Sequence, residues 1–430
     1  MTGLILIAIF LVALCFHVPI MIALGIASVT YCLAIANVPI NMIMNTYFTS
    51  MDSFPLIAVP FFILAGDLMM QGGISKRLIN FSLALIGGIR GSLGMVTALT
   101  SMIFAAVAGS GTATVACIGG ITIPEMLKQK YDKGFACALA ATAGALGPII
   151  PPSVAMILYG VICGVSITDL FIAGVIPGIM MAAALIILVH FIAKKRGYGS
   201  GLLDDVKAGE VVSLRKAFKE AIWSLMVPAI ILGGIYGGIF TPTEAAVVAC
   251  DFAIFVGIFI YKEYTFKDIP GIIKKSATTA GTVMLLVACA SALGRLLTFE
   301  RIPNQLAEAI IGLSDNKIII LLIINLFLLI VGMFMETYAA IIILAPILLP
   351  TVVNVGVDPL HFGMIMVLNL TLGLCTPPVG VNLFIASRIG NCPLDKMFKW
   401  LLPTLAVLFI VLLLVTYIPA LSMTLPKILR

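Results

Sequence analysis

Two proline-rich segments interrupt long apolar stretches of this sequence, at 146–153 (LGPIIPPS) and at 373–382 (GLCTPPVGVN). Proline has no backbone N–H and clashes with the carbonyl four residues before it, so a helix must open at each segment. An opened helix presents free carbonyl groups at the end of its first part, which can bind a cation. The start of its second part favours an anion. These residues therefore predict ion binding within a membrane.

A segment of small, hydroxyl-rich residues precedes the first proline-rich break at 109–114 (GSGTAT), and its counterpart before the second break lies at 332–337 (GMFMET). We expect each of these segments to be the tip of a hairpin that enters the membrane and returns to the same side. Hydroxyl and carbonyl oxygens suit a hard cation such as sodium. The alternative is that the small residues only let helices approach closely. Because two such tips precede two breaks in the same order, we interpret them as binding sites.

Charged residues are rare within the apolar stretches, and an ionised group there is costly and often functional. We favour Glu336, at the second predicted tip, as a functional group. Positions near the membrane surface can explain several of the others. Glu244 fits the first turn of a helix that Thr241 or Thr243 caps. The full set is Asp67, Glu244, Asp251, Arg295, Glu336 and Arg388.

The sequence argues against an enzyme. The metalloprotease motif HExxH, the phosphate-binding motif GxxxxGK[ST] and the nucleophile motif GxSxG are all absent. The three histidines are far apart, and the nine cysteines stand singly in mostly apolar surroundings, as buried free thiols do. We predict no catalytic residue, no organic cofactor and no metal beyond sodium. An intramembrane enzyme remains the alternative from another functional class.

Composition identifies the class of protein. Of the 430 residues, 62% are hydrophobic and 10% are charged, and the mean hydropathy is +1.21. Soluble domains are about 45–50% apolar and about 25% charged. The long unbroken apolar runs exclude a β-barrel, and the chain has room for about ten transmembrane spans of about 20 residues each. Without a basic cluster interleaved with aromatics, nucleic acid is excluded as a partner. We predict an all-α polytopic membrane protein embedded in a lipid bilayer.

The chain repeats itself. A shift of 226 positions places Pro151 and Pro152 on Pro377 and Pro378, and Asp132 on Asp358. Proline makes up only about 5% of an average sequence, so chance does not explain the match. We predict a first repeat over 1–200, a cytoplasmic linker over 201–220 and a second repeat over 221–430. Further matching pairs are Pro124 and Pro350, Asp169 and Asp395, and Pro177 and Pro403.

Lysine and arginine predict the orientation, because cytoplasmic loops are enriched in them. The loop 194–219 and the linker 262–275 are basic, so both are placed inside. Each half then has about five transmembrane helices plus one re-entrant hairpin, and this odd number makes the repeats inverted, as in secondary transporters. No loop could hold a soluble domain. We expect hairpins at 93–126 and 318–350, broken spans at 134–168 and 360–390, and polar connections at 45–53 and 299–316.

Several motifs together resemble the large membrane subunit of tripartite ATP-independent periplasmic (TRAP) transporters, of the DctM or SiaM type. The resemblance covers essentially the whole chain, and each motif is weak alone but strong in this order. The motifs lie at 52–67, 72–75, 109–115, 151–153, 240–246 and 376–384.

The resemblance implies an elevator-type transporter, related in fold to the divalent-anion sodium symporters, in the bacterial inner membrane. It implies two or more sodium ions as coupling ions, a small four-helix membrane subunit and a periplasmic binding protein that delivers the substrate. We expect the small subunit to be a separate polypeptide. The implied function is sodium-coupled import of a small carboxylate, of the sialic acid or C4-dicarboxylate class. The alternative within transport is a stand-alone sodium–dicarboxylate symporter.

The resemblance also implies site residues, since sodium sites in such folds pair a hairpin tip with the break that follows it. The first predicted sodium site consists of Ser110, Gly147, Ile150 and Pro152. The second consists of Gly332, Gly373, Thr376 and Val379. The substrate is expected between the two tips, near Gly111, Thr112, Ser153, Glu336, Thr337 and Asn382.

Overall fold

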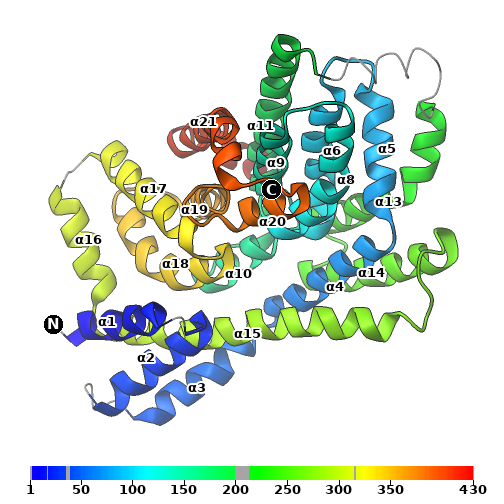
Figure 1. Cartoon of the computed structure of the whole chain (residues 1–430). Helices are drawn as coiled ribbons and strands as arrows, with labels where there is room; N and C mark the ends of the chain where they lie inside the picture. The colour runs from blue at the N-terminus through cyan, green and yellow to red at the C-terminus, as the bar shows by residue number, and fades with distance from the viewer. Residues whose placement is uncertain (1, 17, 35–38, 199–212, 314–315, 430) are drawn as a thin grey trace.

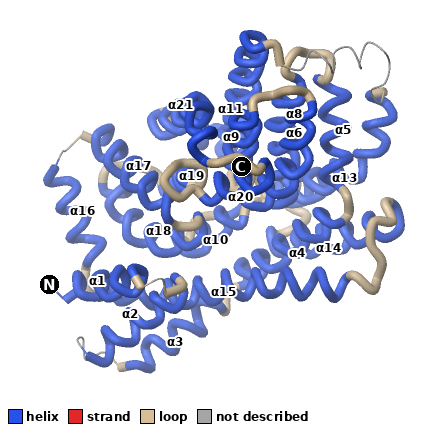
Figure 2. The backbone as a smooth tube through the Cα atoms, in the orientation of Figure 1, coloured by secondary structure: helices blue, strands red, loops and turns tan. Residues whose placement is uncertain are grey.

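The computed structural model describes residues 2–16, 18–34, 39–198, 213–313 and 316–429, and within these ranges it contains helices and no strands (Figures 1 and 2). Eight of the described helices are long and apolar enough to cross a membrane. The shorter apolar helices include both parts of each proline-broken segment. The predicted all-α polytopic membrane fold is confirmed.

The helices of the first half are α1 (Thr2–Cys15), α2 (Ile20–Ala34), α3 (Ile40–Met51), the 3₁₀ turn η1 (Phe54–Ile57), α4 (Ala58–Gln71), α5 (Ile74–Ile86), α6 (Ser92–Ala108), α7 (Gly111–Thr114), the π-helical turn η2 (Val115–Gly119), α8 (Gly120–Lys128), α9 (Lys133–Ala143), the 3₁₀ turn η3 (Gly144–Leu146), α10 (Val154–Cys163) and α11 (Ile167–Arg196).

The helices of the second half are α13 (Leu214–Tyr236), α14 (Pro242–Phe255), the π-helical turn η4 (Val256–Ile260), α15 (Ile269–Phe299), α16 (Ile302–Leu313), α17 (Lys317–Phe334), α18 (Thr337–Asn354), α19 (Pro359–Gly373), α20 (Val381–Gly390), α21 (Leu394–Tyr417) and α22 (Ala420–Leu429). Of the predicted linker 201–220, residues 201–212 lie outside the described residues. The remainder is largely the first turns of α13.

Residues that match across the sequence repeat occupy corresponding helices. Asp132 caps α9 by accepting a hydrogen bond from the Phe135 N–H at 3.0 Å, and Asp358 caps α19 by accepting one from the Leu360 N–H at 2.8 Å. An acidic side chain at a helix start satisfies backbone donors that have no partner within the helix. Asp169 and Asp395 likewise lie in the first turns of α11 and α21.

Three segments that we interpreted as polar connections are partly helical. Most of 45–53 belongs to α3, the segment 299–316 contains α16, and the basic linker 262–275 ends inside α15, which begins at Ile269. Polar residues on one face of a helix lower its mean hydropathy, so a hydropathy reading mistakes such a helix for a loop. The helix start at Glu244 is confirmed, because Thr241 and Glu244 form a reciprocal capping box.

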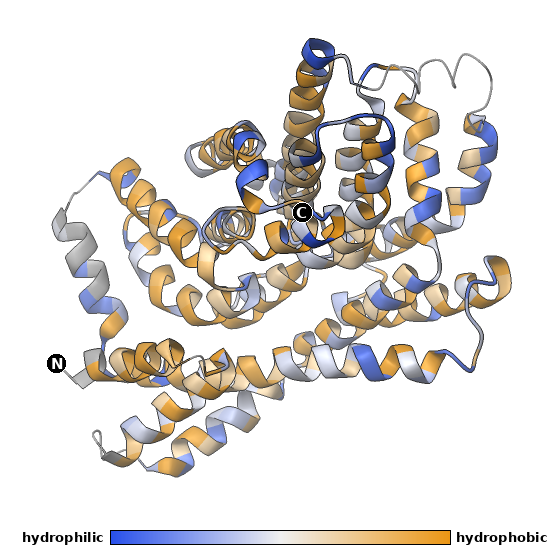
Figure 3. Ribbon diagram, in the orientation of Figure 1, coloured by the Kyte–Doolittle hydropathy of each residue, from blue (hydrophilic) through white to orange (hydrophobic). Residues whose placement is uncertain are grey.

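The two halves interlock. Helix α10 of the first half packs against α18 of the second, and α20 of the second half packs against α9 of the first. The Tyr159 hydroxyl on α10 donates to the carbonyl of Pro359 on α19 at 2.7 Å. Apolar residues also cover most of the helices (Figure 3), and large side chains such as Phe191 and Leu402 are exposed, as lipid contact requires.

Candidate functional site

The first predicted tip is a turn between two helices. Helix α6 ends at Ala108, Gly109 has a φ of +59°, and Ser110 is extended and directly precedes α7. Glycine adopts this left-handed backbone without the steric cost that a side chain adds. The Ser110 and Thr112 hydroxyls lie 3.1 Å apart at this turn.

The first tip lies directly against the first proline-rich break. A Cβ atom added to Gly147 would overlap the carbonyl of Ser110, and one added to Gly109 would lie 2.9 Å from the Pro152 carbonyl oxygen. Only residues without a side chain allow such an approach. The structure thus brings together Ser110, Gly147 and Pro152 of the first predicted sodium site. The Ile150 side chain instead packs toward Gly178 on α11, so its main chain is the part available to the site.

Proline also leaves backbone oxygens without their helical donors in this break. Pro151 and Pro152 cannot donate to the carbonyls of Gly147 and Pro148. The Pro148 carbonyl accepts a hydrogen bond from the Ser153 hydroxyl instead, and the same hydroxyl caps α10 by accepting from the Met156 N–H at 3.3 Å. The Gly147 carbonyl is therefore one oxygen that the break leaves available next to the tip.

The second half repeats this arrangement. A Cβ atom on Gly373 would overlap the backbone of Gly332, and the Gly380 N–H donates to the Met333 carbonyl at 3.2 Å. Thr376 donates its hydroxyl proton to the Leu372 carbonyl at 2.8 Å, which leaves the hydroxyl oxygen able to accept or coordinate. Partly exposed Val379 precedes Gly380 on the same break. The residues of the second predicted site therefore share one junction of tip and break.

Two buried oxygen atoms near these junctions have no hydrogen-bond donor among the described residues: Asn382 Oδ1 and Thr337 Oγ1. The Asn382 amide, in the second half, donates to the Ala141 carbonyl of the first half at 3.4 Å. Its nitrogen also lies 3.4 Å from the position that a Cβ atom on Gly111 would occupy. A buried polar atom without a partner costs about 1–3 kcal/mol. A bound cation is one partner that would satisfy such an oxygen. The oxygen atoms near the two junctions therefore fit a sodium ion.

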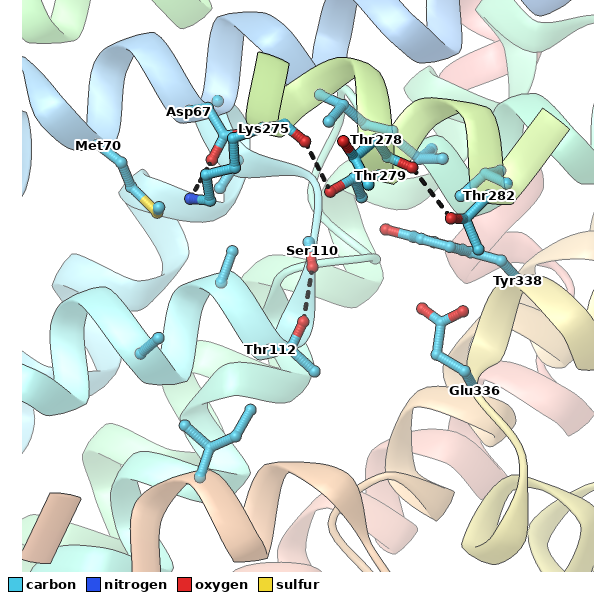
Figure 4. A pocket seen from close by; sticks show the side chains of 18 residues that line it. Asp67, Met70, Ser110, Thr112, Lys275, Thr278, Thr279, Thr282, Glu336 and Tyr338 are labelled. Carbon is cyan, nitrogen blue, oxygen red and sulfur yellow. Dashed lines mark hydrogen bonds and ion pairs between the residues drawn. The ribbon is translucent and has the colours of Figure 1, made fainter. Parts of the chain in front are cut away.

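A cavity of about 640 Å³ lies between the two tips and helices α4 and α15 (Figure 4). Small-molecule sites have volumes of about 300–1,000 Å³. Helix α15 contributes a row of polar side chains, and the second tip contributes a carboxylate and a phenol. The polar lining residues are Asp67, Ser110, Thr112, Lys275, Thr278, Thr279, Thr282, Glu336 and Tyr338.

Two of the six predicted substrate residues, Thr112 and Glu336, line this cavity, and Ser110 lines it as well. The other four do not form part of its wall. Ser153, Thr337 and Asn382 are at most 1% exposed, and Gly111 is also buried. The reason is geometric, because these residues hold the tips and breaks together beneath the surface that faces the cavity.

The polar side chains of α15 that line the cavity were not identified from the sequence. They recur at positions 275, 278, 279 and 282, the spacing that places side chains on one face of a helix. The signal was hidden because Lys275 stood at the end of an apparent linker. In the structure the Lys275 ammonium lies 2.8 Å from the Asp67 carboxylate (Figure 4). The Ser276 hydroxyl donates to the other Asp67 oxygen at 2.7 Å.

Comparison with known proteins agrees with this architecture. The profile of the family described as "Tripartite ATP-independent periplasmic transporter, DctM component" matches residues 7–421. The YdaH transporter of Alcanivorax borkumensis has a similar fold, with a TM-score of 0.62 over 96% of this chain and 97% of that one, at 15% sequence identity. This likeness extends to the fold alone.

Three relatives illustrate the range of the family. The chain is 46% identical over 406 residues to the isethionate TRAP transporter permease protein DctMQ of Oleidesulfovibrio alaskensis, and it spans 63% of that longer protein. It is 37% identical to the C4-dicarboxylate TRAP transporter large permease protein DctM of Rhodobacter capsulatus over the full length of both. It is 41% identical to the sialic acid TRAP transporter large permease protein SiaM of Vibrio cholerae over 90% of both.

The relatives are transporter permeases rather than enzymes, and this chain shares their multi-pass helical architecture. The chain belongs to the DctM family of large permease subunits of TRAP transporters.

Proposed function

We propose that this permease imports a small organic acid into the bacterial cell, driven by sodium, and that the cavity between the two tips is where the acid binds. The single observation that carries the proposal is this cavity, which has a tip-and-break junction of each half at its wall. Ser110 belongs to one junction and Glu336 lies at the other tip, and both line the cavity. Ions bound at the junctions would thus be close enough to couple to a substrate.

Sodium is the proposed coupling ion, with two or more ions per substrate. The first proposed site uses Ser110, Gly147, Ile150 and Pro152, and the second uses Gly332, Gly373, Thr376 and Val379. Hydroxyl and carbonyl oxygens are the ligands that hard cations prefer. Support comes from the close approach of backbones at both junctions and from the unpartnered oxygens of Asn382 and Thr337.

The proposed movement is of the elevator type, in which the two tips and the two breaks travel as one body. Support comes from contacts that join them. The Tyr338 hydroxyl, two residues after Glu336, lies 3.5 Å from the Gly109 carbonyl and donates to it, so the second tip is linked to the first. Helices α20 and α9 also pack together across the halves.

The proposed partners are a small four-helix membrane subunit and a periplasmic binding protein that delivers the acid. The relatives in the family support this assignment, since one of them is named as a DctMQ permease and is longer than this chain. None of the described segments could itself serve as a soluble capture domain, because the helices follow one another through short connections.

The test is uptake into proteoliposomes that contain this chain and its small subunit, with and without an inward sodium gradient and the purified binding protein. The solutes are sialic acid, a C4-dicarboxylate and isethionate. Uptake that requires both sodium and the binding protein supports the proposal. Uptake that requires sodium but no binding protein would instead indicate a stand-alone symporter. Uptake that is indifferent to sodium would refute sodium coupling.

A further inference from the structure

Lys275 is the one cationic side chain among the described residues that line the cavity, whose wall also contains the carboxyl groups of Asp67 and Glu336. Its side chain is 57% exposed, so the ammonium group can be reached from the cavity. The Asp67 side chain is only 12% exposed. The cavity thus contains one cationic group that an acid could contact, and that group is at present paired with a carboxylate of the protein.

The Asp67 carboxylate has a second partner that does not depend on Lys275. Its Oδ1 atom contacts the Lys275 ammonium at 2.8 Å, whereas its Oδ2 atom accepts a hydrogen bond from the Ser276 hydroxyl at 2.7 Å. An ion pair between solvent-exposed side chains is worth only about 0–1 kcal/mol, and the Lys275 member of this pair is exposed. Lys275 can therefore exchange Asp67 for another anion at little cost, while Ser276 still satisfies the carboxylate it leaves.

We propose that Lys275 is the anion-binding group of this transporter, and that the acidic group of the substrate replaces Asp67 as its partner. This assignment rests on the proposed function, because it places the substrate in the same cavity. Asp67 then competes with the substrate for Lys275. It pairs with the ammonium group when the cavity is empty, and the acidic group of the substrate replaces it.

The charges of the cavity also select the number of acidic groups on the substrate. One ammonium group can pair with one carboxylate or sulfonate. A second acidic group would face the released Asp67 carboxylate, and like charges at close range repel each other. The cavity therefore suits an acid with a single negative charge better than a dicarboxylate.

The remaining polar side chains of the cavity wall indicate that the substrate carries hydroxyl groups. The hydroxyls of Thr278, Thr279 and Thr282 donate to carbonyls four residues earlier on α15, at 2.9, 3.3 and 3.0 Å. Their oxygen atoms are thereby left as acceptors that line the cavity. Acceptors of this kind recognise hydroxyl protons. The substrate class is accordingly a hydroxylated monoanion, either a carboxylate or a sulfonate.

The experiment compares wild-type protein with K275Q, K275R and D67N, reconstituted with the small subunit, sodium and the binding protein. The probes are isethionate and sialic acid as hydroxylated monoanions and succinate as a dianion. Lys274, exposed on the same helix but absent from the cavity wall, provides the control variant K274Q. Thermal stabilisation of the purified protein by each solute measures binding without the transport cycle.

We expect K275Q to raise the half-saturating concentration of the monoanions at least tenfold and to abolish their thermal stabilisation, whereas K275R retains part of both. K274Q should behave as wild type. D67N should lower the half-saturating concentration of the monoanions and improve uptake of succinate, because the competitor and one repelling charge are gone.

Two results would overturn the inference while leaving the proposed function intact. One is sodium-dependent uptake of succinate alone by the wild type. The other is a K275Q variant whose affinity and preference for monoanions equal those of K274Q. If the wild type shows neither uptake of nor thermal stabilisation by any of the three solutes, the inference fails together with the substrate class of the proposed function.

Discussion

Gly147 in the first proline-rich break lies so close to Ser110 at the first hairpin tip that a Cβ atom on Gly147 would overlap the Ser110 carbonyl. The same relationship joins Gly373 to Gly332 in the second half. In both halves a tip and a break that are distant in sequence form one continuous backbone surface. The carbonyl groups of Ser110 and Gly332 thereby lie against the two breaks, and carbonyl oxygens are ligands that hard cations prefer.

The variant G147A should strongly reduce sodium-dependent uptake. Gly147 has φ −51° and ψ −57°, which alanine adopts readily, so the effect would come from contact with the tip rather than from backbone strain. The measurement is the initial rate of uptake in proteoliposomes at saturating sodium. We expect a loss of at least tenfold, which corresponds to about 1.4 kcal/mol or more.

Gly120 on α8 offers the matched control, because a Cβ atom there would meet nothing within 4 Å. The variant G120A should transport at the wild-type rate. If G147A transported as well as G120A, the close packing of tip and break would have no role in the cycle.

The variant T376A should weaken the activation of transport by sodium while leaving the protein folded. The Thr376 hydroxyl donates to the Leu372 carbonyl, and its oxygen is the proposed ligand, so alanine removes one ligand from a site made partly of carbonyls. We expect the sodium concentration for half-maximal uptake to rise roughly tenfold, as a lost ligand worth about 1.5 kcal/mol would cause.

Serine at position 376 keeps the hydroxyl, so T376S should restore most of the sodium affinity. S110A makes the corresponding test of the first site. Sodium activation that is unchanged in T376A would count against the second site as drawn, and the same result in S110A would count against the first.

Replacing Asn382 by alanine should also reduce sodium affinity, even though the residue does not line the cavity. Its Oδ1 atom is buried without a donor among the described residues, and its amide group contacts the first half through the Ala141 carbonyl. Sodium titration of uptake by N382A is the measurement, and a rise of several-fold in the half-activating concentration is expected. Exposed Asn354 at the end of α18 supplies the control variant N354A.

An unaltered sodium response in N382A would show that the unpartnered oxygen is a packing feature. A lower transport rate with an unaltered sodium response would indicate that Asn382 links the two halves structurally and is not a sodium ligand.

A buried amide pair should stabilise the second half independently of transport. The Asn369 amide on α19 donates to the backbone and side-chain oxygens of Asn325 on α17 at 2.8 and 2.7 Å, and Asn325 donates to Thr416 on α21 at 3.2 Å. Hydrogen bonds between membrane helices contribute about 0.6–2 kcal/mol each. N369A should therefore lower the apparent melting temperature of the purified protein by a few degrees, measured by thermal unfolding in detergent.

The sodium affinity of N369A should match that of the wild type, because these residues do not belong to either proposed site. A melting temperature equal to that of the wild type would mean that Asn325 and Thr416 find other partners when Asn369 is removed.

Much of the fold was predictable from the sequence, because its determinants are local. An apolar stretch of about 20 residues specifies a membrane helix whatever surrounds it. Two consecutive prolines in the middle of an apolar stretch open a helix, so the breaks at Pro151–Pro152 and Pro377–Pro378 were recognisable in the sequence, whereas single prolines such as Pro177 and Pro403 lie inside helices. The helix start at Glu244, capped by Thr241 or Thr243, was predicted for the same reason, since a capping box involves only four consecutive residues, and the structure shows that Thr241 is the cap.

The cavity wall depended on tertiary structure, because its side chains come from segments far apart in the chain. Nothing near Asp67 in sequence identifies Lys275 as its partner, and the helical start of α15 was concealed by its polar residues. Ser153, Thr337 and Asn382 carry the right chemistry for a substrate site, yet packing buries them. Residue type and local spacing thus determined where helices form and break, while the contacts between the interlocked halves decided which polar groups face the cavity.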